Sequence, residues 1–158
     1  MGECRFGSKR LKARLVSDFL REFGDGLPES SIADAVSSKN LEHWHLLCDD
    51  KKPKQINSGV YWDQNDWYLC TMKNLATRPS ERGKGLATKV VQRAFDQAAR
   101  SPNCHVLAAD ITTTNIPSQR VFEKGGFSKV NDFCWQRGQK PANVLHYVRM
   151  RPKAGECK

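Results

Sequence analysis

Residues 77–88 read Thr77-Arg-Pro-Ser-Glu-Arg82-Gly83-Lys84-Gly85-Leu86-Ala87-Thr88. A strand-like segment precedes them. The apolar residues from Leu86 to Ala98 then recur at helical spacing, so a helix begins within the stretch. The N–H groups at a helix start lack intrahelical partners and carry partial positive charge. Gly83 and Gly85 leave that backbone open to a ligand, and Arg82 and Lys84 add positive charge. The stretch therefore predicts an anion site suited to a pyrophosphate.

The residues on either side predict alternating helices and strands. We expect helices at 8–24, 30–36, 86–98 and 117–124, and strands at 41–48, 58–62, 66–77, 105–111, 127–136 and 144–151. Residues 63–65 are expected to form a hairpin turn and 137–143 a polar loop, and a further short strand is possible at 4–6. Strand–helix–strand units in this order predict an α/β layered domain with a mixed sheet.

The length and composition bound the class of protein. A chain of 158 residues with 39% hydrophobic and 27% charged residues predicts one soluble globular domain, residues 1–158. No run approaches the roughly 18 apolar residues of a membrane helix. The first residues, Met1 to Arg5, lack the apolar core of a signal peptide. We therefore expect a cytoplasmic protein, or a nuclear one if the host has a nucleus, without a membrane partner.

The chain is basic and contains six cysteines. Its 26 basic and 17 acidic residues give a formal charge of +9, which favours a polyanionic partner such as nucleic acid, an anionic membrane or a phosphate-rich cofactor. The cysteines, at 4, 48, 70, 104, 134 and 157, include no CxxC pair and match no zinc signature, so no metal is expected. We expect reduced thiols, with Cys70 and Cys134 as small core residues.

Three nucleotide-binding patterns can be compared with residues 77–88. A Walker P-loop requires GxxxxGK[ST], but Lys84 is followed by Gly85. A dinucleotide GxGxxG pattern requires glycine at 88, where threonine stands. The third pattern, R-x-x-G-x-A, is matched by Arg82, Gly85 and Ala87. It resembles the acetyl-CoA pyrophosphate loop of the GNAT (N-acetyltransferase) superfamily.

A second segment, from Asn115 to Phe127, strengthens this resemblance. It reads NIPSQRVFEKGGF and is similar to the N-x-x-A-x-x-x-Y-x-x-x-G-F pattern common in GNAT enzymes. Asn115, Gly126 and Phe127 match in register, and Ser118 replaces alanine. Phe122 replaces the tyrosine that usually serves as the general acid. The resemblance covers about residues 66–150.

The resemblance implies a fold, a cofactor and a set of binding residues. The fold would be a mainly antiparallel mixed sheet of six or seven strands, flanked by about four helices. The loop would hold the pyrophosphate of acetyl-CoA through backbone N–H groups, and the strand before it would pair with the pantetheine arm. Residues after the fifth strand would contact pantetheine or adenosine. The implied cofactor-binding residues are Leu75, Thr77, Arg82, Gly83, Lys84, Gly85, Leu86, Ala87, Thr88, Asn115 and Phe122.

The reaction implied is direct attack of an amine on the acetyl thioester. An alkyl amine with a pKa near 10.4 must first lose a proton, at a cost of about 4.6 kcal/mol at pH 7. A thiol with a pKa near 8.5 leaves far more easily, at about 2 kcal/mol, so a base matters more than an acid. We expect Asp110 to be the base, the Thr77 N–H to meet the oxyanion, and Tyr147 or a water to replace the missing acid.

The acceptor is expected to be a primary amine, of a small molecule rather than of a protein. Residues 22–38 contain Glu22, Asp25, Glu29 and Asp34 but no lysine or arginine, so Glu29 and Asp34 are candidates for attracting a cationic amine. The family leaves a homodimer open. Two alternatives remain. One is a non-catalytic CoA-binding regulatory module, which Phe122 favours, and the other is an N-acetyltransferase that acts on a protein. A nucleic-acid-binding domain is not expected, since the chain lacks the usual recognition motifs.

Overall fold

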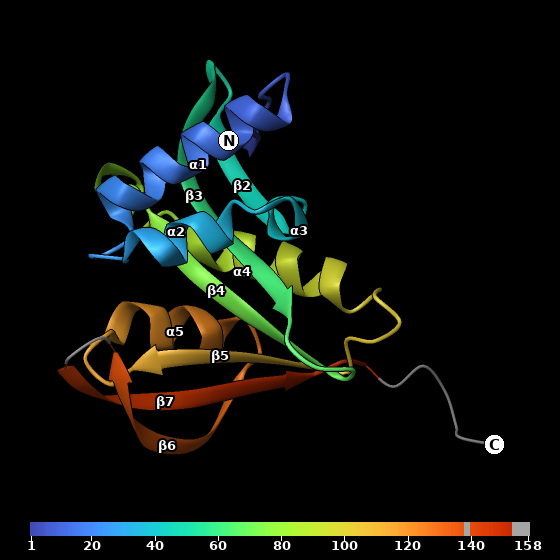
Figure 1. The fold of residues 1–158 in the computed structure, drawn as a ribbon, viewed down its shortest axis with the longest axis vertical. Helices are drawn as coiled ribbons and strands as arrows, with labels where there is room; N and C mark the ends of the chain where they lie inside the picture. Colours follow the sequence, from blue (N-terminus) through green and yellow to red (C-terminus); the bar gives the residue numbers. More distant parts are fainter. Residues whose placement is uncertain (138–139, 153–158) are drawn as a thin grey trace. The chain divides into compact units, whose positions relative to one another are not determined.

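The computed structural model describes residues 1–137 and 140–152. They form two compact units (Figure 1), one of residues 1–63 and 72–94, the other of residues 64–71 and those from Phe95 on. Strand β4 (Leu69–Thr77) and helix α4 (Leu86–Ala98) contribute to both units. The expectation of a single domain spanning 1–158 stays a prediction.

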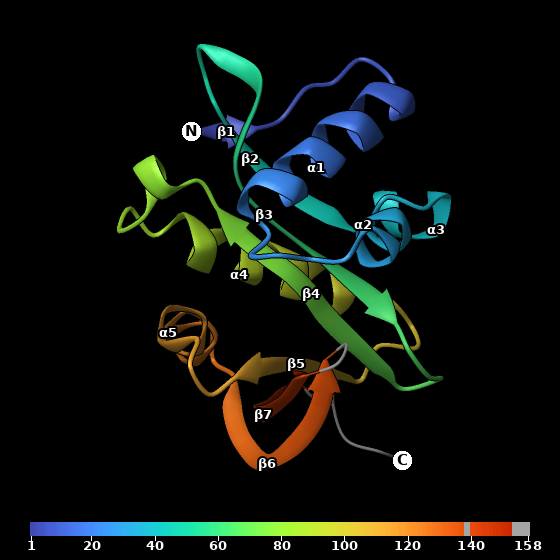
Figure 2. The same cartoon turned by 60° about the vertical axis from the view of Figure 1, so that its left-hand side comes forward.

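The first unit contains the N-terminal helices and strands. Its elements are β1 (Gly2–Glu3), α1 (Lys9–Phe23), α2 (Glu29–Ala35), α3 (Ser38–Leu41), β2 (Trp44–Asp49), most of β3 (Lys52–Gln64), the end of β4, the 3₁₀ turn η1 (Pro79–Glu81) and most of α4. Figures 1 and 2 show α1 and α2 on one face of the strands and α4 on the other. The start of α4 follows the end of β4 after the turn η1 and a short loop.

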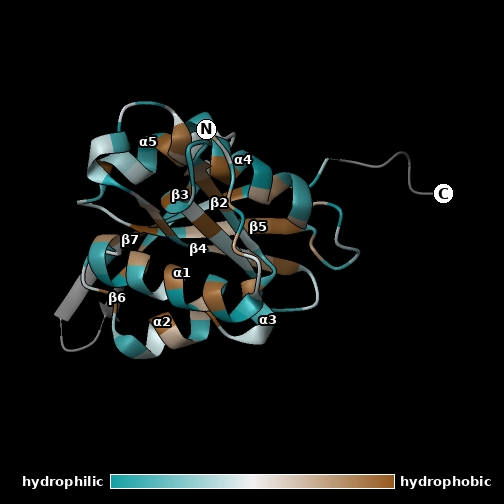
Figure 3. Ribbon diagram, turned by 90° about the horizontal axis from the view of Figure 1, so that it is seen from above, coloured by the Kyte–Doolittle hydropathy of each residue, from teal (hydrophilic) through white to brown (hydrophobic). Residues whose placement is uncertain are grey.

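The core of the first unit explains why these helices form. Helix α1 has alternating apolar and polar stripes (Figure 3), and Val16, Phe19 and Leu20 are buried against residues of β2, β3 and α2. Ser8 caps the helix by accepting a hydrogen bond from Leu11 N at 3.1 Å. The indole of Trp44 donates to the carbonyl of Ala35 at 2.7 Å, which joins β2 to α2.

The second unit is built on strands β5 (Val106–Thr112), β6 (Ser128–Arg137) and β7 (Lys140–Met150), with helix α5 (Ile116–Lys124). Strand β7 pairs antiparallel with both β5 and β6. The rings of Phe122 on α5 and Phe127 meet edge-on at 5.1 Å, and the Arg149 guanidinium lies 3.7 Å from the ring centre of Phe95. The first contact packs α5 against the residue before β6, and the second packs Phe95 of α4 against β7.

The described strands form one seven-stranded mixed sheet in the order β1-β2-β3-β4-β5-β7-β6. Pairing is parallel between β4 and β5, where Leu69–Thr71 faces Val106–Ala108, and antiparallel for β1–β2, β2–β3, β5–β7 and β6–β7. The predicted mixed, mainly antiparallel α/β fold is confirmed. The described part of the chain contains five α-helices where about four were expected.

Several predicted boundaries are wrong. Residues 38–41 form α3, so the strand predicted at 41–48 begins at Trp44. Strand β3 spans Lys52–Gln64 instead of 58–62, the hairpin turn falls at 65–68, and β1 covers 2–3 instead of 4–6. Helix α2 spans Glu29–Ala35 instead of 30–36. In the loop predicted at 137–143, residues 140–143 belong to β7, and 138–139 lie outside the described residues.

The expectation of reduced thiols is also wrong in the structure. Strand β1 pairs Glu3 with Leu47, which brings the next residue, Cys4, to a Cα–Cα distance of 5.0 Å from Cys48, and the two form a disulfide. A second disulfide joins Cys70 to Cys104. Cys70 is buried as predicted, but Cys134 on β6 is exposed and unpaired among the described cysteines.

Candidate functional site: the loop before helix α4

The loop between η1 and α4 has the backbone that an anion site requires. Gly83 and Gly85 adopt left-handed conformations, with φ of 78° and 76°. A Cβ atom built at either position meets no atom within 4 Å, so the space beside this backbone is open. Among the described residues, the first N–H at this helix start with a backbone partner is that of Lys89, which donates to Gly85 O at 3.1 Å. The preceding N–H groups are therefore available to a ligand.

One side chain of this segment anchors the helix start, and others carry its charge. Leu86 is buried and fixes the start of α4, whereas Arg82 to Gly85 are exposed. Lys84 forms an ion pair with Glu81 at 2.9 Å, so part of the positive charge expected from the sequence is neutralised within the loop. Arg82 Nε donates to the carbonyl of Thr77 at 3.4 Å, which joins the loop to the end of β4.

Strand β4 is irregular just before this loop. Asn74 has a φ of 55°, a conformation that non-glycine residues seldom adopt in a strand. The alternation of buried and partly exposed residues breaks over Lys73, Asn74 and Leu75, as at a β-bulge. The Thr77 hydroxyl lies 2.9 Å from that of Ser58 on β3, which ties the strand end down. The sequence analysis missed this irregularity, and an asparagine inside a strand is the signal that could have found it.

In the second unit, Asp110 has a partner that the sequence analysis did not identify. Asp110 on β5 and His146 on β7 are directly opposite in the antiparallel register. Asp110 Oδ1 lies 2.5 Å from His146 Nδ1, and the two side chains are 32% and 28% exposed. The structure places Asp110 on a partly exposed face of the sheet. The alternation of strand residues could have placed both on one face, but only the register brings them together.

Tyr147 lies on the opposite face of β7 from His146. Its hydroxyl is buried and donates to Glu123 Oε1 on α5 at 2.9 Å. Burial, together with the Glu123 carboxylate, raises the pKa of Tyr147 above its usual range, so the hydroxyl keeps its proton at neutral pH. Its proton is directed to Glu123.

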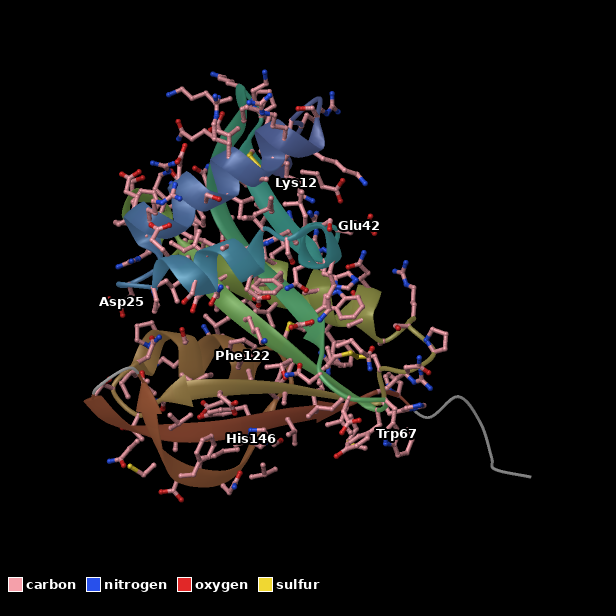
Figure 4. The ribbon with its side chains drawn as sticks, viewed as in Figure 1. Lys12, Asp25, Glu42, Trp67, Phe122 and His146 are labelled. Atoms are coloured by element: carbon pink, nitrogen blue, oxygen red, sulfur yellow. A yellow bond between two sulfur atoms is a disulfide. The ribbon has the colours of Figure 1, made fainter. Side chains whose placement is uncertain are left out.

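Phe122 and Asn115 both have structural contacts in the second unit. Phe122 is buried against Phe127, so the position where the family commonly has tyrosine is filled by a core side chain (Figure 4). The side chain of Asn115 accepts from Ser118 N at 3.2 Å and caps α5. Neither contact involves the open backbone of the loop before α4.

The acidic residues of the first unit differ in their surroundings. Glu29 forms hydrogen bonds with Arg21 at 2.9 and 3.1 Å, and these bonds lower the pKa of its carboxyl. Arg21 lies one residue before the acidic segment 22–38, so the sequence analysis missed the pairing. Asp34 is exposed at the end of α2, and no ion pair to it is found in the described chain.

The comparisons with known proteins agree with this geometry. A family model described as "Acetyltransferase (GNAT) family" matches residues 13–127, which is more than half of the chain. The chain belongs to the GNAT acetyltransferase family. Members of this family use acetyl-CoA as their cofactor. A search of curated proteins found no match.

Solved GNAT structures share the fold at low sequence identity. The yncA protein of Salmonella typhimurium, solved with its cofactor acetyl-CoA, is 14% identical with a TM-score of 0.73, and the match covers 98% of this chain and 96% of that one. A chimera of the spermidine N-acetyltransferase SpeG from Vibrio cholerae and hSSAT is 13% identical, with 90% and 93% covered and a TM-score of 0.68. Ribosomal-protein-alanine N-acetyltransferase from Brucella melitensis is 12% identical, with 92% and 98% covered and a TM-score of 0.70.

Two further observations concern the described residues of this GNAT chain. No helix among them is both long and apolar enough to cross a bilayer. No group of three or more His, Cys, Asp or Glu side chains in the described part of the chain could hold a metal ion.

Proposed function

We propose that this protein is an acetyl-CoA-dependent N-acetyltransferase that acetylates a primary amine of a small molecule. The observation that carries the proposal is the open left-handed backbone at Gly83 and Gly85, at the start of α4 in a GNAT chain. Phosphate oxygens accept hydrogen bonds from such N–H groups, and the helix start favours negative charge. The N–H groups from Gly83 to Thr88 would hold the pyrophosphate of acetyl-CoA, with Arg82 and Lys84 beside it.

In this proposal the other cofactor contacts follow from the strands. The backbone of Leu75 and Thr77, beside the irregular Asn74, would pair with the pantetheine arm as an added strand does. The Thr77 N–H would donate to the oxyanion. Asn115 and Phe122, both in the second unit, stay predicted cofactor-binding residues, and the side chain of Asn115 caps α5.

The chemistry proposed is direct transfer. The amine nitrogen attacks the carbonyl carbon, the C–S bond breaks, and CoA leaves as a thiolate. The amine must lose a proton first, and Asp110 is the residue proposed to accept it. Since the Tyr147 hydroxyl donates to Glu123, we propose that the thiolate takes the proton that remains on the attacking nitrogen, without a tyrosine acid. Asp34, unlike the paired Glu29, is the carboxylate proposed to attract a cationic amine.

The names of two structural neighbours include one small-molecule acceptor and one protein acceptor. One is a spermidine N-acetyltransferase chimera and the other a ribosomal-protein-alanine N-acetyltransferase, so the shared fold accommodates both amine classes. The small acceptor is proposed here because residues 22–38 carry acidic side chains without a basic residue. A cytoplasmic location and a homodimer stay predictions.

The test is a panel of amines incubated with acetyl-CoA, with acetylated products and released CoA measured by mass spectrometry. We expect at least one small primary amine to be acetylated with matching release of CoA. Transfer only to peptide N-termini or lysines would replace the small-molecule acceptor by a protein. Tight CoA binding without any transfer would support the regulatory module, for which the buried Phe122 is the structural observation.

A further inference from the structure

We propose that the first unit binds double-stranded nucleic acid through its phosphates, at a basic surface separate from the loop before α4. This surface, the basic end, consists of six exposed cations: Arg5, Arg10, Arg14, Lys51, Lys52 and Lys54. The proposal does not rest on acetyl transfer. The lack of recognition motifs argued against nucleic acid in the sequence, but contacts to phosphates require no such motif.

Two segments of the first unit come together at the basic end. The backbone N–H of Arg5 donates to the carbonyl of Pro53 at 2.8 Å, which joins the segment before α1 to the start of β3. The Cys4–Cys48 disulfide joins the segment before α1 to β2. Figures 1 and 2 show the turn between β2 and β3 and the start of α1 at the same end of this unit. The lysines around the turn and the three arginines therefore lie at one end of the unit.

The protein leaves most of the charge of the basic end unneutralised. Residues 1–14 and 49–54 hold eight basic and three acidic side chains. Of these acids, Asp50 pairs with the amine of Met1, and Asp49 accepts from the backbone N–H of Lys51 at 2.8 Å. None of the six cations forms an ion pair with any described residue. Ion pairs hold other cations of the same unit: Lys9, Arg21, Lys39, Lys73 and Lys84.

Arg10 and Arg14 provide a place for one phosphate group. They are four residues apart on α1, so they extend from the same side of the helix. Together with Ser8 and Leu11 they line a groove of about 400 Å³. A guanidinium group can bind two phosphate oxygens at once. The first turn of α1 contains no acidic residue that would repel a phosphate.

The side chains of the first unit favour a duplex over a single strand or a bilayer. Proteins that bind single strands stack the bases on aromatic rings, and helices that bind membranes bury apolar side chains in the lipid. Among the described residues of the first unit, Met1 is the only exposed large apolar side chain. A duplex presents about one phosphate charge per 1.7 Å of its axis and requires neither kind of contact. Binding should therefore be independent of base sequence.

The test is the binding of two fluorescein-labelled DNA duplexes of unrelated sequence, measured by anisotropy from about 50 to 200 mM salt. We expect equal affinities for the two duplexes. Six phosphate contacts would give a slope of about −5 for log association constant against log salt concentration. Arg10→Gln/Arg14→Gln and Lys52→Gln/Lys54→Gln should each weaken binding about tenfold or more at low salt and reduce the slope by about 2.

The matched control is Arg120→Gln/Lys124→Gln. It removes two exposed cations four residues apart on α5 and lowers the net charge by the same amount, so it should bind the duplexes as the parent does. Since the two test variants alter separate segments, a loss in both together with unchanged thermal unfolding supports the basic end as the binding surface. Saturating CoA should leave duplex binding intact.

Four results would overturn the proposal. The parent could bind neither duplex, or the α5 control could lose as much affinity as the test variants, which would make net charge the cause. CoA could displace the duplex, which would place the duplex at the loop before α4. Vesicles of phosphatidylcholine and phosphatidylserine could bind more tightly than the duplexes, which would make the basic end a membrane surface.

Discussion

Gly85 and Gly7 are equivalent in backbone conformation but differ in position. Both have positive φ, 76° and 79°, and a Cβ atom at either meets nothing within 4 Å. Gly85→Glu places a carboxylate where the pyrophosphate is proposed to bind, whereas Gly7→Glu introduces the same backbone strain, of order 1–3 kcal/mol, before α1. We expect Gly85→Glu to abolish CoA binding in calorimetry and Gly7→Glu to retain it. Equal affinities in the two folded variants would place the cofactor elsewhere.

The residues of the site were predictable to different degrees. The loop from Arg82 to Thr88 could be read from the sequence because its chemistry is local: glycines, charge and a helix start lie within a few positions. The partner of Asp110 could not, because His146 is 36 positions away and is brought opposite by the β5–β7 register. The pairing of Glu29 with Arg21 depends similarly on the turn between α1 and α2.

At the scale of elements, Asp63 at the end of β3 links three segments of the first unit. Its carboxylate forms ion pairs with Lys39 of α3 at 3.0 Å and with Lys73 of β4 at 3.1 Å. Burial by itself would raise the pKa of Asp63, but the contacts with Lys39 and Lys73 outweigh it and hold the pKa below the ordinary 3.8. The ionised form therefore stabilises the fold above that pH, and this contribution is lost as the pH falls through the lowered pKa.

We expect Asp63→Asn to lower the free energy of unfolding at pH 7 by about 1–3 kcal/mol, because two ammonium groups lose their carboxylate. Below pH 3.8 the difference from the parent should shrink, since the carboxyl becomes protonated first in the unfolded chain and then, as the pH falls through the lowered pKa, in the folded one. Denaturant unfolding at both pH values measures this, with Asp132→Asn as the exposed control. A difference that stays constant with pH would mean that the charge of Asp63 does not contribute.

The elements that the sequence predicted well are those with strong periodicity. Helix α1 and helix α4 have apolar stripes and clear ends, and they lie where expected. Strand β3 is six residues longer at its start and two longer at its end than the predicted segment, because residues 52–54 are exposed and residues 52–55 carry no apolar alternation. Lys52 pairs with Asp49 of β2 across the turn and Ile56 pairs with Cys48, contacts that local composition does not show.

At the scale of the whole molecule, the charge of +9 acts on any phosphate-bearing ligand. The loop itself supplies less of this attraction than its sequence suggested, because Lys84 is paired with Glu81. Exposed charges are screened beyond about 10 Å at 0.1 M salt and beyond about 3 Å at 1 M salt.

CoA affinity should therefore fall as salt rises from 0.1 to 1 M. Backbone hydrogen bonds at the loop should persist, so binding should weaken without vanishing. Pantetheine, which has no phosphates, is the matched ligand, and calorimetry should show its affinity to be nearly independent of salt. A CoA affinity that also ignores salt would mean that main-chain donors hold the pyrophosphate without help from the net charge.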